Sequence, residues 1–301
     1  MSSGNALFDR RCRLTIVTPV STPNDFKNVT SDVVEIDGGV SDDRLAAGMR
    51  ITFKIKKKLK KEPNTGEIEV YNLNQDRRSS LQQKGVKVRL EAGYKDTGFT
   101  QYFAGDVRTV DHIRKDGDWV TTLRLGDGER AWNYARVSES FAPGTLKGDV
   151  LRAVGKALGV EAGNLEKQAA RLSGAFDQGF TAFGSTARSM ELLVTSLGLN
   201  WSIQDGQIQI LKLDEVLDLP VEEITPDTGL VGSPEMGTPT KKGGPALVQF
   251  TALLRPTKPG AKVKLSSERY PTGFVKVVNC DFDGDTMGGE WYTKIDGEVL
   301  K

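Results

Sequence analysis

The amino-acid sequence predicts a mainly β chain with a small α+β module near its middle. Apolar and polar residues alternate with period two in short runs toward both ends of the chain, which is typical of half-buried strands. Between these runs, apolar residues recur at helical spacing over residues 146–158 and again over residues 190–197. The 33 glycines and the modest 38% of hydrophobic residues favour many turns and a large wetted or partner-covered surface.

The first segment, residues 1–134, is predicted to be β throughout. Residues 63–66 carry proline and glycine and mark a turn between two of the expected strands. The expected strands are 13–17, 33–36, 51–56, 67–71, 86–94, 103–107 and 119–125. Short strands at this density predict a barrel or a sandwich.

The middle segment, residues 135–215, is predicted to be the α+β module. A first helix follows Gly144-Thr145 and ends at the stop signal Gly159, and a second begins at Thr186 and ends at Gly198. Strands over 200–204 and 207–211 then flank Asp205-Gly206, a strong hairpin signal.

The last segment, residues 216–301, returns to the β pattern. A Gly/Pro-rich stretch over 229–245 precedes strands that are expected over 247–254, 261–265 and 273–278. Residues 281–285 resemble a calcium loop, but Thr286 stands where that motif requires glycine and Glu290 comes two residues early. A turn between strands is the favoured interpretation.

The chemistry-bearing residues argue against an enzyme. The single histidine, His112, lies in a strand-like run, and Cys12 and Cys280 lie near opposite ends of the chain. No metal-ligand cluster, phosphate-binding loop or nucleophile motif is present, so we expect no catalytic residue, cofactor or metal. Carboxylate spacing alone leaves a lysozyme-type activity open.

Charge and hydropathy give further expectations. With 41 Lys+Arg against 40 Asp+Glu, a general nucleic-acid binder is disfavoured. No window is apolar enough for a membrane helix or a signal peptide, so we expect no membrane insertion and folding in a reducing cytoplasm.

The most prominent local feature is a run of six lysines within residues 54–61. The apolar residues at 51, 53 and 55 place Lys54 and Lys56 on the solvent side of a strand, with the remaining lysines expected in the following turn. A solvated face is the favoured interpretation, and a partner-facing or lumen-facing patch and a nucleic-acid site are the alternatives. The candidate partner-interface residues are Lys57, Lys58, Lys60 and Lys61.

Several stretches, taken in order, resemble the baseplate hub family of tailed phages, including late-control D-type proteins. In the first segment they are residues 51–55, 62–73, 91–94, 103–107 and 125–128. In the module they are 144–146 and 197–202, and in the last segment 254–256, 259–265 and 284–293. Cys280 is a departure, because many relatives carry a histidine before the Gly284-Asp285 turn.

The resemblance implies two tube-type β-barrels, 1–134 and 216–301, that flank the module and superpose on each other. It implies a homotrimer whose six barrels form a ring joining a six-fold tail tube to a three-fold central spike. The tape-measure protein is a further implied partner, and nucleic acid would pass only in transit. The implied location is the baseplate of a virion tail assembled in the host bacterial cytoplasm, with no fused spike or lytic domain. The alternatives are a tail-tip cell-wall hydrolase and a glycan-binding tail-tip protein.

Overall fold

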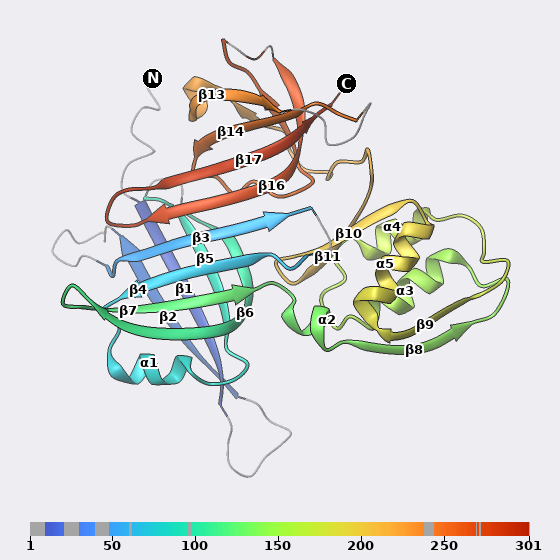
Figure 1. The fold of residues 1–301 in the computed structure, drawn as a ribbon, viewed down its shortest axis with the longest axis horizontal. Coiled ribbons are helices and arrows are strands. Elements are labelled where there is room, and N and C mark those ends of the chain that lie inside the picture. Colours follow the sequence, from blue (N-terminus) through green and yellow to red (C-terminus); the bar gives the residue numbers. More distant parts are fainter. Residues whose placement is uncertain are drawn as a thin grey trace.

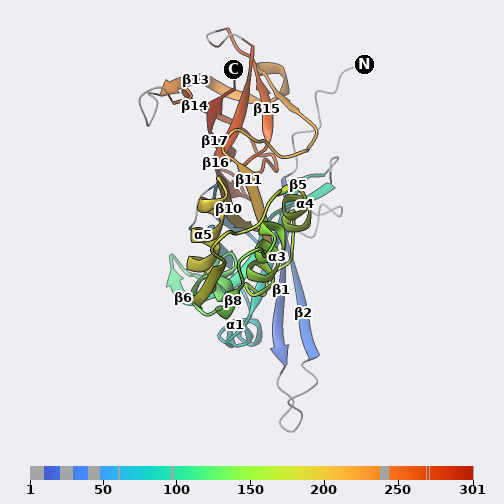
Figure 2. The ribbon, with the colours of Figure 1, turned by 90° about the vertical axis from the view of Figure 1, so that its right-hand side faces the viewer.

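A computed structural model describes residues 10–20, 30–39, 48–59, 62–95, 98–237, 244–268, 270 and 272–300. One sheet of 13 strands runs through the first and last segments, and the helical module lies to one side of it (Figure 1). The turned view in Figure 2 shows the module in front of the strands. None of the helices in the described ranges is long and apolar enough to cross a membrane.

The first strand group forms an antiparallel sheet in the order β3-β4-β7-β6-β5-β1-β2. Its strands are β1 (Arg10–Val20), β2 (Thr30–Gly39), β3 (Ile51–Lys58), β4 (Thr65–Tyr71), β5 (Lys87–Tyr94), β6 (Gly98–Lys115) and β7 (Asp118–Gly126). Helix α1 (Gln75–Leu81) connects β4 to β5. A bridge between Gly38 and Met49 brings the end of β2 beside the residues that precede β3.

The last strand group continues the same sheet in the order β13-β14-β17-β16, with β15 also on β16 and β12 parallel to β15. Its strands are β12 (Glu222–Ile224), β13 (Leu230–Gly237), β14 (Leu247–Leu253), β15 (Lys262–Leu265), β16 (Gly273–Asp285) and β17 (Trp291–Val299). A 3-10 turn, η1 (Pro226–Thr228), separates β12 from β13. The two groups join where β16 pairs with β3, from Asn279 opposite Lys58 to Asp285 opposite Thr52. We call this pairing the seam.

The hydrophobic core beneath the seam contains side chains from both strand groups. The ring of Phe53 lies edge-on to Trp291 with centroids 5.6 Å apart, and Tyr102 lies edge-on to Phe282 at 5.2 Å. All four side chains are buried and belong to one continuous hydrophobic cluster. Aromatic pairs of this geometry add about 0.5–1.5 kcal/mol each beyond the burial of their area.

The module has its own core. It comprises α2 (Glu129–Asn133), β8 (Arg136–Phe141), α3 (Lys147–Lys156), α4 (Leu165–Arg171), β9 (Phe180–Ser185), α5 (Thr186–Ser196), β10 (Leu199–Gln204) and β11 (Gln207–Lys212). Leu151 and Met190 are fully buried between its helices. Trp132 stacks on Trp201 with ring centroids 4.7 Å apart, which ties α2 to the β10–β11 hairpin.

The predicted class, mainly β with an α+β insert, is confirmed. Among the described residues, the strand pairings follow one path from β13 to β2 with no closed barrel, and the pairing of β3 with β16 joins both groups into a single sheet. Superposition of the two groups stays a prediction.

One local prediction in the last segment was wrong, because the expected turn over 281–285 is the end of β16. In addition, the Gly/Pro-rich stretch over 229–245 contains strand β13, for which no strand was predicted. In β16 the acidic side chains alternate with buried Cys280 and Phe282, so the segment has the period-two pattern of a strand.

Candidate functional site

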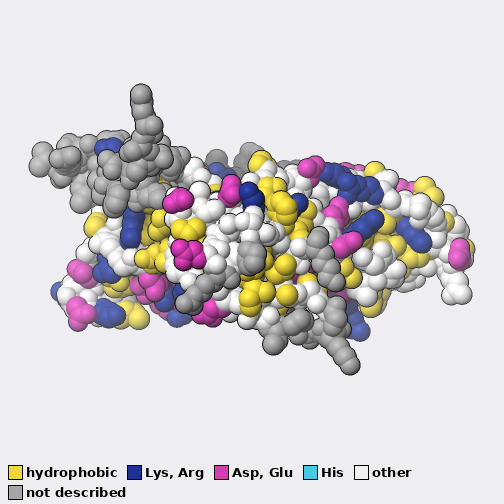
Figure 3. All heavy atoms as spheres, turned by 90° about the horizontal axis from the view of Figure 1, so that it is seen from above, with side chains coloured by type: hydrophobic (Ala, Val, Ile, Leu, Met, Phe, Trp, Pro, Cys, Tyr) yellow, Lys and Arg dark blue, Asp and Glu magenta, His cyan; other side chains and the backbone are white. Residues whose placement is uncertain are grey.

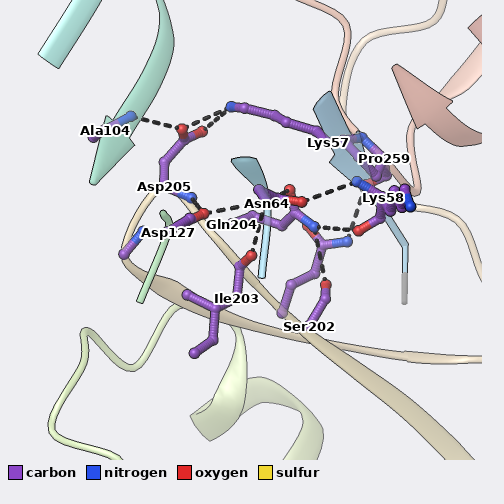
Figure 4. Close-up of polar contacts among 12 residues, drawn as sticks. Lys57, Lys58, Asn64, Ala104, Asp127, Ser202, Ile203, Gln204, Asp205 and Pro259 are labelled. Carbon is purple, nitrogen blue, oxygen red and sulfur yellow. Dashed lines mark hydrogen bonds and ion pairs between the residues drawn. The ribbon is translucent and has the colours of Figure 1, made fainter. Parts of the chain in front are cut away.

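The β10–β11 turn meets the end of β3 in a buried polar cluster (Figure 4). Asp205 and Gly206 form the turn with φ of 55° and 80°, the left-handed geometry of a two-residue hairpin. Lys57 reaches this turn, and its Nζ lies 2.7 and 2.6 Å from the two carboxylate oxygens of Asp205. The Lys57 side chain is only 3% exposed and that of Asp205 10%. We call Lys57, Asn64, Asp127, Gln204 and Asp205 the hairpin junction.

Asp127, the residue just after β7, binds the backbone of the β10–β11 turn. Its carboxylate accepts the backbone N–H groups of Asp205 at 2.6 Å and Gly206 at 2.8 Å, and the side-chain amide of Asn64 at 3.1 Å. Burial and the neighbouring Asp205 carboxylate raise the pKa of Asp127 from 3.8 to about 6, although the hydrogen bonds and Lys57 oppose this rise. At neutral pH the junction therefore holds two carboxylates against one ammonium.

Two amide side chains close the network. Asn64 Nδ2 also donates to the carbonyl oxygen of Ile203 at 3.0 Å and to Gln204 Oε1 at 2.9 Å. Gln204 Nε2 donates to the Lys58 carbonyl oxygen at 2.8 Å, while the Lys58 N–H donates to Asn64 Oδ1 at 2.9 Å. The polar groups of the junction are thus used to hold the hairpin against β3.

The hairpin and the chain after it also contact the last strand group. Gln209 on β11 donates its side-chain amide to the Pro259 carbonyl oxygen at 2.9 Å. Lys276 on β16 donates to the Leu213 carbonyl oxygen at 2.7 Å, and burial lowers the pKa of this lysine. The module therefore contacts both strand groups, one on each side of the seam.

The lysine run divides between two environments. Lys54 and Lys56 are exposed on β3, as the alternation predicts. Lys57 lies at the end of β3 instead of in a turn and is buried in the hairpin junction. Lys58, also still within β3, is partly exposed with its Nζ 3.4 Å from Glu62, and Lys60 and Lys61 lie outside the described residues.

Sequence reasoning missed the hairpin junction although a signal for it was present. Residue 57 continues the inward row of residues 51, 53 and 55, so the alternation itself places a lysine on the buried side. A buried ammonium needs an anionic partner. The role of the lysine run at an interface stays a prediction.

The outward side of the sheet carries cross-strand charges. Arg124 on β7 lies 2.7 Å from Asp111 on β6 and 3.4 Å from Glu67 on β4. On the other side of the seam, Lys294 on β17 lies 3.0 Å from Asp283 on β16. We call the outward residues of β14, β17, β16, β3, β4, β7 and β6 the polar sheet face.

The polar sheet face continues across the seam without a break. Lys54 on β3 stands opposite Asp283 on one side and Glu67 on the other. Basic and acidic side chains are also interspersed on the part of the surface drawn in Figure 3. Protein interfaces are depleted in Lys, Glu and Asp, so a face built from such pairs suits contact with water.

The residues considered for catalysis or metal binding have the following contacts and burial. His112 on β6 places Nδ1 3.1 Å from Thr121 Oγ1. Asp285 of the calcium-like segment forms an ion pair with Arg50 at 2.7 Å, and no cluster of metal-ligating side chains occurs within the described ranges. Cys12 and Cys280 are free and fully buried, and burial raises the pKa of both thiols.

Comparison with known proteins finds similarity in solved structures only. No family model matches the chain, and no curated protein matches its sequence. A tail protein from Neisseria meningitidis MC58 superposes with a TM-score of 0.61 at 9% identity, covering 95% of this chain and 96% of that one. The 43 kDa tail protein of prophage MuSo2 from Shewanella oneidensis gives 0.60 at 10% identity, with the same coverage.

A third similar structure comes from a secretion system. It is an E. coli component of the type VI secretion system, described as structurally similar to the T4 bacteriophage tail proteins gp27 and gp5. It superposes with a TM-score of 0.55 at 8% identity, covering 84% of this chain and 74% of that one. At such identities the shared property is the fold, and the predicted resemblance to phage tail hub proteins is confirmed at that level.

Proposed function

We propose that this chain is a non-enzymatic structural protein of a phage or phage-like tail, acting as a trimeric hub between the six-fold tail tube and the three-fold central spike. The observation that carries the proposal is the end-to-end similarity of fold to a tail protein, over 95% of this chain and 96% of that one. Similarity over nearly the whole length of both chains favours a shared architectural role over a single shared domain.

The hairpin junction supports a role in which the chain acts as a rigid body. A symmetry adaptor must hold its contact surfaces in fixed relative positions. The module is tied to both strand groups through buried polar contacts, including Lys57 with Asp205 and Gln209 with Pro259. In this proposal the strand groups of 1–134 and 216–301 serve as the two tube-type units, and the module of 135–215 braces them.

The stoichiometry gives the first test. Native mass spectrometry of the purified protein, and of tail-derived complexes, is expected to give a particle of three copies. A particle of one or six copies would contradict the trimeric adaptor. Peptidoglycan zymography and glycan-binding assays are expected to be negative. Clearing that a single acidic substitution abolishes would instead support the tail-tip hydrolase, and glycan binding would support the glycan-binding tail-tip protein.

The lysine run gives the second test. Within this proposal Lys58, Lys60 and Lys61 dock on the tube or the spike, whereas Lys57 is needed inside the subunit. Replacing those three with Glu while keeping Lys57 is expected to leave the subunit folded and to reduce incorporation into tails. Glu at the exposed Lys84, Lys87 and Lys156 is the matched control. Normal tail yield from the first variant would show that the run is only a solvated segment.

A further inference from the structure

The chain contains six Asp-Gly dipeptides, and the structure separates them by what holds each aspartate. They begin at Asp37, Asp116, Asp127, Asp205, Asp283 and Asp296. An Asp-Gly dipeptide is chemically reactive, because the backbone nitrogen after the aspartate belongs to glycine. Glycine has no side chain to keep that nitrogen away from the aspartate carboxyl carbon, and its backbone reaches conformations closed to other residues.

Three of the dipeptides begin inside strands, and their carboxylates are bound. Asp37 on β2 accepts the Arg13 guanidinium at 2.8 Å. Asp283 on β16 forms an ion pair with Lys294 at 3.0 Å. Asp296 on β17 accepts two side-chain amides, at 2.9 and 3.0 Å. The extended backbone at each position is also fixed by the strands that pair with it.

Two further dipeptides belong to the hairpin junction. Lys57 Nζ lies 2.7 and 2.6 Å from the two carboxylate oxygens of Asp205. The N–H of Gly206, whose nitrogen is the reactive one, donates to Asp127 at 2.8 Å. The Asp127 carboxylate is held by this N–H and by the N–H of Asp205 at 2.6 Å. A reaction at either aspartate therefore requires the junction to open first.

Asp116 lies at the tip of the β6–β7 hairpin and is the exception. Asp116 and Gly117 form the turn with φ of 52° and 94°, close to the 55° and 80° of Asp205 and Gly206. Both tip residues are exposed, and within the described parts of the chain the Asp116 carboxylate has no hydrogen bond or ion pair. A methyl group on Gly117 Cα would meet no atom within 4 Å beyond its neighbours in sequence. The same dipeptide is thus locked in one hairpin turn and free in the other.

We propose that Asp116 is a site of spontaneous isoaspartate formation in the folded protein, and that contacts protect the other five Asp-Gly dipeptides. The inference does not depend on the role of the chain in a tail. In the first step the Gly117 nitrogen attacks the side-chain carboxyl carbon of Asp116 and forms a C–N bond. The OH group of the protonated carboxyl and the amide hydrogen leave together as water, and a cyclic succinimide remains.

Hydrolysis then opens the ring. Water adds to the main-chain carbonyl carbon of Asp116, and the bond from that carbon to the Gly117 nitrogen breaks. The main chain now runs through Cβ and Cγ of residue 116, and the former main-chain carbonyl becomes a free carboxylate. The water lost in the first step is regained, so the mass is unchanged and no oxidant, reductant or cofactor takes part.

The modification lengthens the main chain at a turn that is anchored directly below its tip. Lys115 stands opposite Asp118, and the Asp118 carboxylate accepts the side-chain amide of Asn72 at 3.1 Å. The N–H of Trp119 donates to the same Asn72 side chain at 3.1 Å. Turn type and loop length fix the register of a hairpin, so an added main-chain carbon displaces these contacts.

Ageing of the purified protein tests the site. One sample stays folded at neutral pH and a second stays unfolded in urea, until the unfolded chain carries isoaspartate at all six dipeptides. A protein isoaspartyl methyltransferase with labelled S-adenosylmethionine counts the isoaspartate, and electron-transfer fragmentation of peptides locates it. In urea Asp116 and Asp205 are expected to react at similar rates. In the folded sample Asp116 is expected to react at least about tenfold faster than Asp205, because reaction at Asp205 waits for local opening.

An Asp116→Glu variant is the matched control. It keeps the charge of the turn, but its longer side chain closes a ring much more slowly, so the label on the folded protein is expected to fall to background. Folded protein without isoaspartate at Asp116 overturns the proposal, and so does equally fast reaction at Asp205. Label that stays at the wild-type level in Asp116→Glu places the reaction elsewhere and also overturns it. None of these results bears on the particle mass that tests the trimeric hub.

Discussion

Removing the ammonium group from the hairpin junction is expected to destabilise the protein strongly. In a Lys57→Met variant the side chain keeps its length, but the Asp205 carboxylate loses the cation that contacts both of its oxygens. Asp205 is 10% exposed and retains only one other described contact, the N–H of Ala104 at 3.2 Å. Breaking a buried pair by removing one partner costs about 3–5 kcal/mol, because an uncompensated charge remains.

The loss is expected to depend on pH. Lys57 is one of the groups that oppose the raised pKa of Asp127, so its removal drives that pKa further above about 6. A carboxyl group whose folded pKa lies above its unfolded value of 3.8 destabilises the fold when ionised, and this effect fades as the pH falls. The Lys57→Met variant is therefore expected to lose more stability at pH 8 than at pH 5.

Urea unfolding followed by tryptophan fluorescence measures both effects. Trp201 reports on the module and Trp291 on the seam. The matched control is Lys54→Met, because Lys54 is exposed on the same strand and is expected to change stability by less than about 0.5 kcal/mol. If Lys57→Met cost no more than this control, or if its cost were the same at both pH values, the assignment of the hairpin junction as a stabilising element would be wrong.

Three further outcomes are expected. An Asp127→Asn variant should lose about 1–3 kcal/mol, because an amide N–H then faces backbone N–H donors. In the wild type, the raised pKa of Asp127 lowers the free energy of unfolding by about 3 kcal/mol as the pH rises from 3.8 to about 6. The Asp127→Asn variant should lack this decrease, as measured by urea midpoints at several pH values. A Gly284→Ala variant should lower the thermal midpoint, at a cost of about 1–3 kcal/mol, because the new Cβ overlaps the Phe53 ring across the seam. A Trp201→Ala variant should lose about 3–5 kcal/mol, and circular dichroism should show loss of the coupled signal from its stack on Trp132.

The strands that are clear in the sequence are those whose two faces meet different environments. β3 and β4 alternate between core and solvent, and the pattern of residues 51–56 and 67–71 marks both. The Asp205-Gly206 turn was equally clear, because both residues adopt the positive φ that such a hairpin requires. These features depend only on neighbours in sequence.

The features that sequence reasoning missed depend on distant partners. β13 contains Gly232 and Pro234, which break a strand pattern, and it is held by pairing with β14 beyond the intervening chain. The merging of the two strand groups rests on the seam, which a local pattern cannot encode. The partner of Lys57 lies 148 residues away, so alternation can show that the lysine is buried but not which carboxylate it meets.

The seam also determines the order in which the chain can fold during synthesis. Phe53 on β3 stands opposite Gly284 on β16, so 231 more residues must be synthesised before β16 can pair with β3. At about 5–20 residues per second this interval is roughly 10 to 50 s. Throughout it, one edge of the newly made first strand group is open to other nascent chains. Lys54 and Lys56 on β3 place positive charge along this unpaired edge. Charged side chains on edge strands are one way in which natural sheets prevent association with other chains.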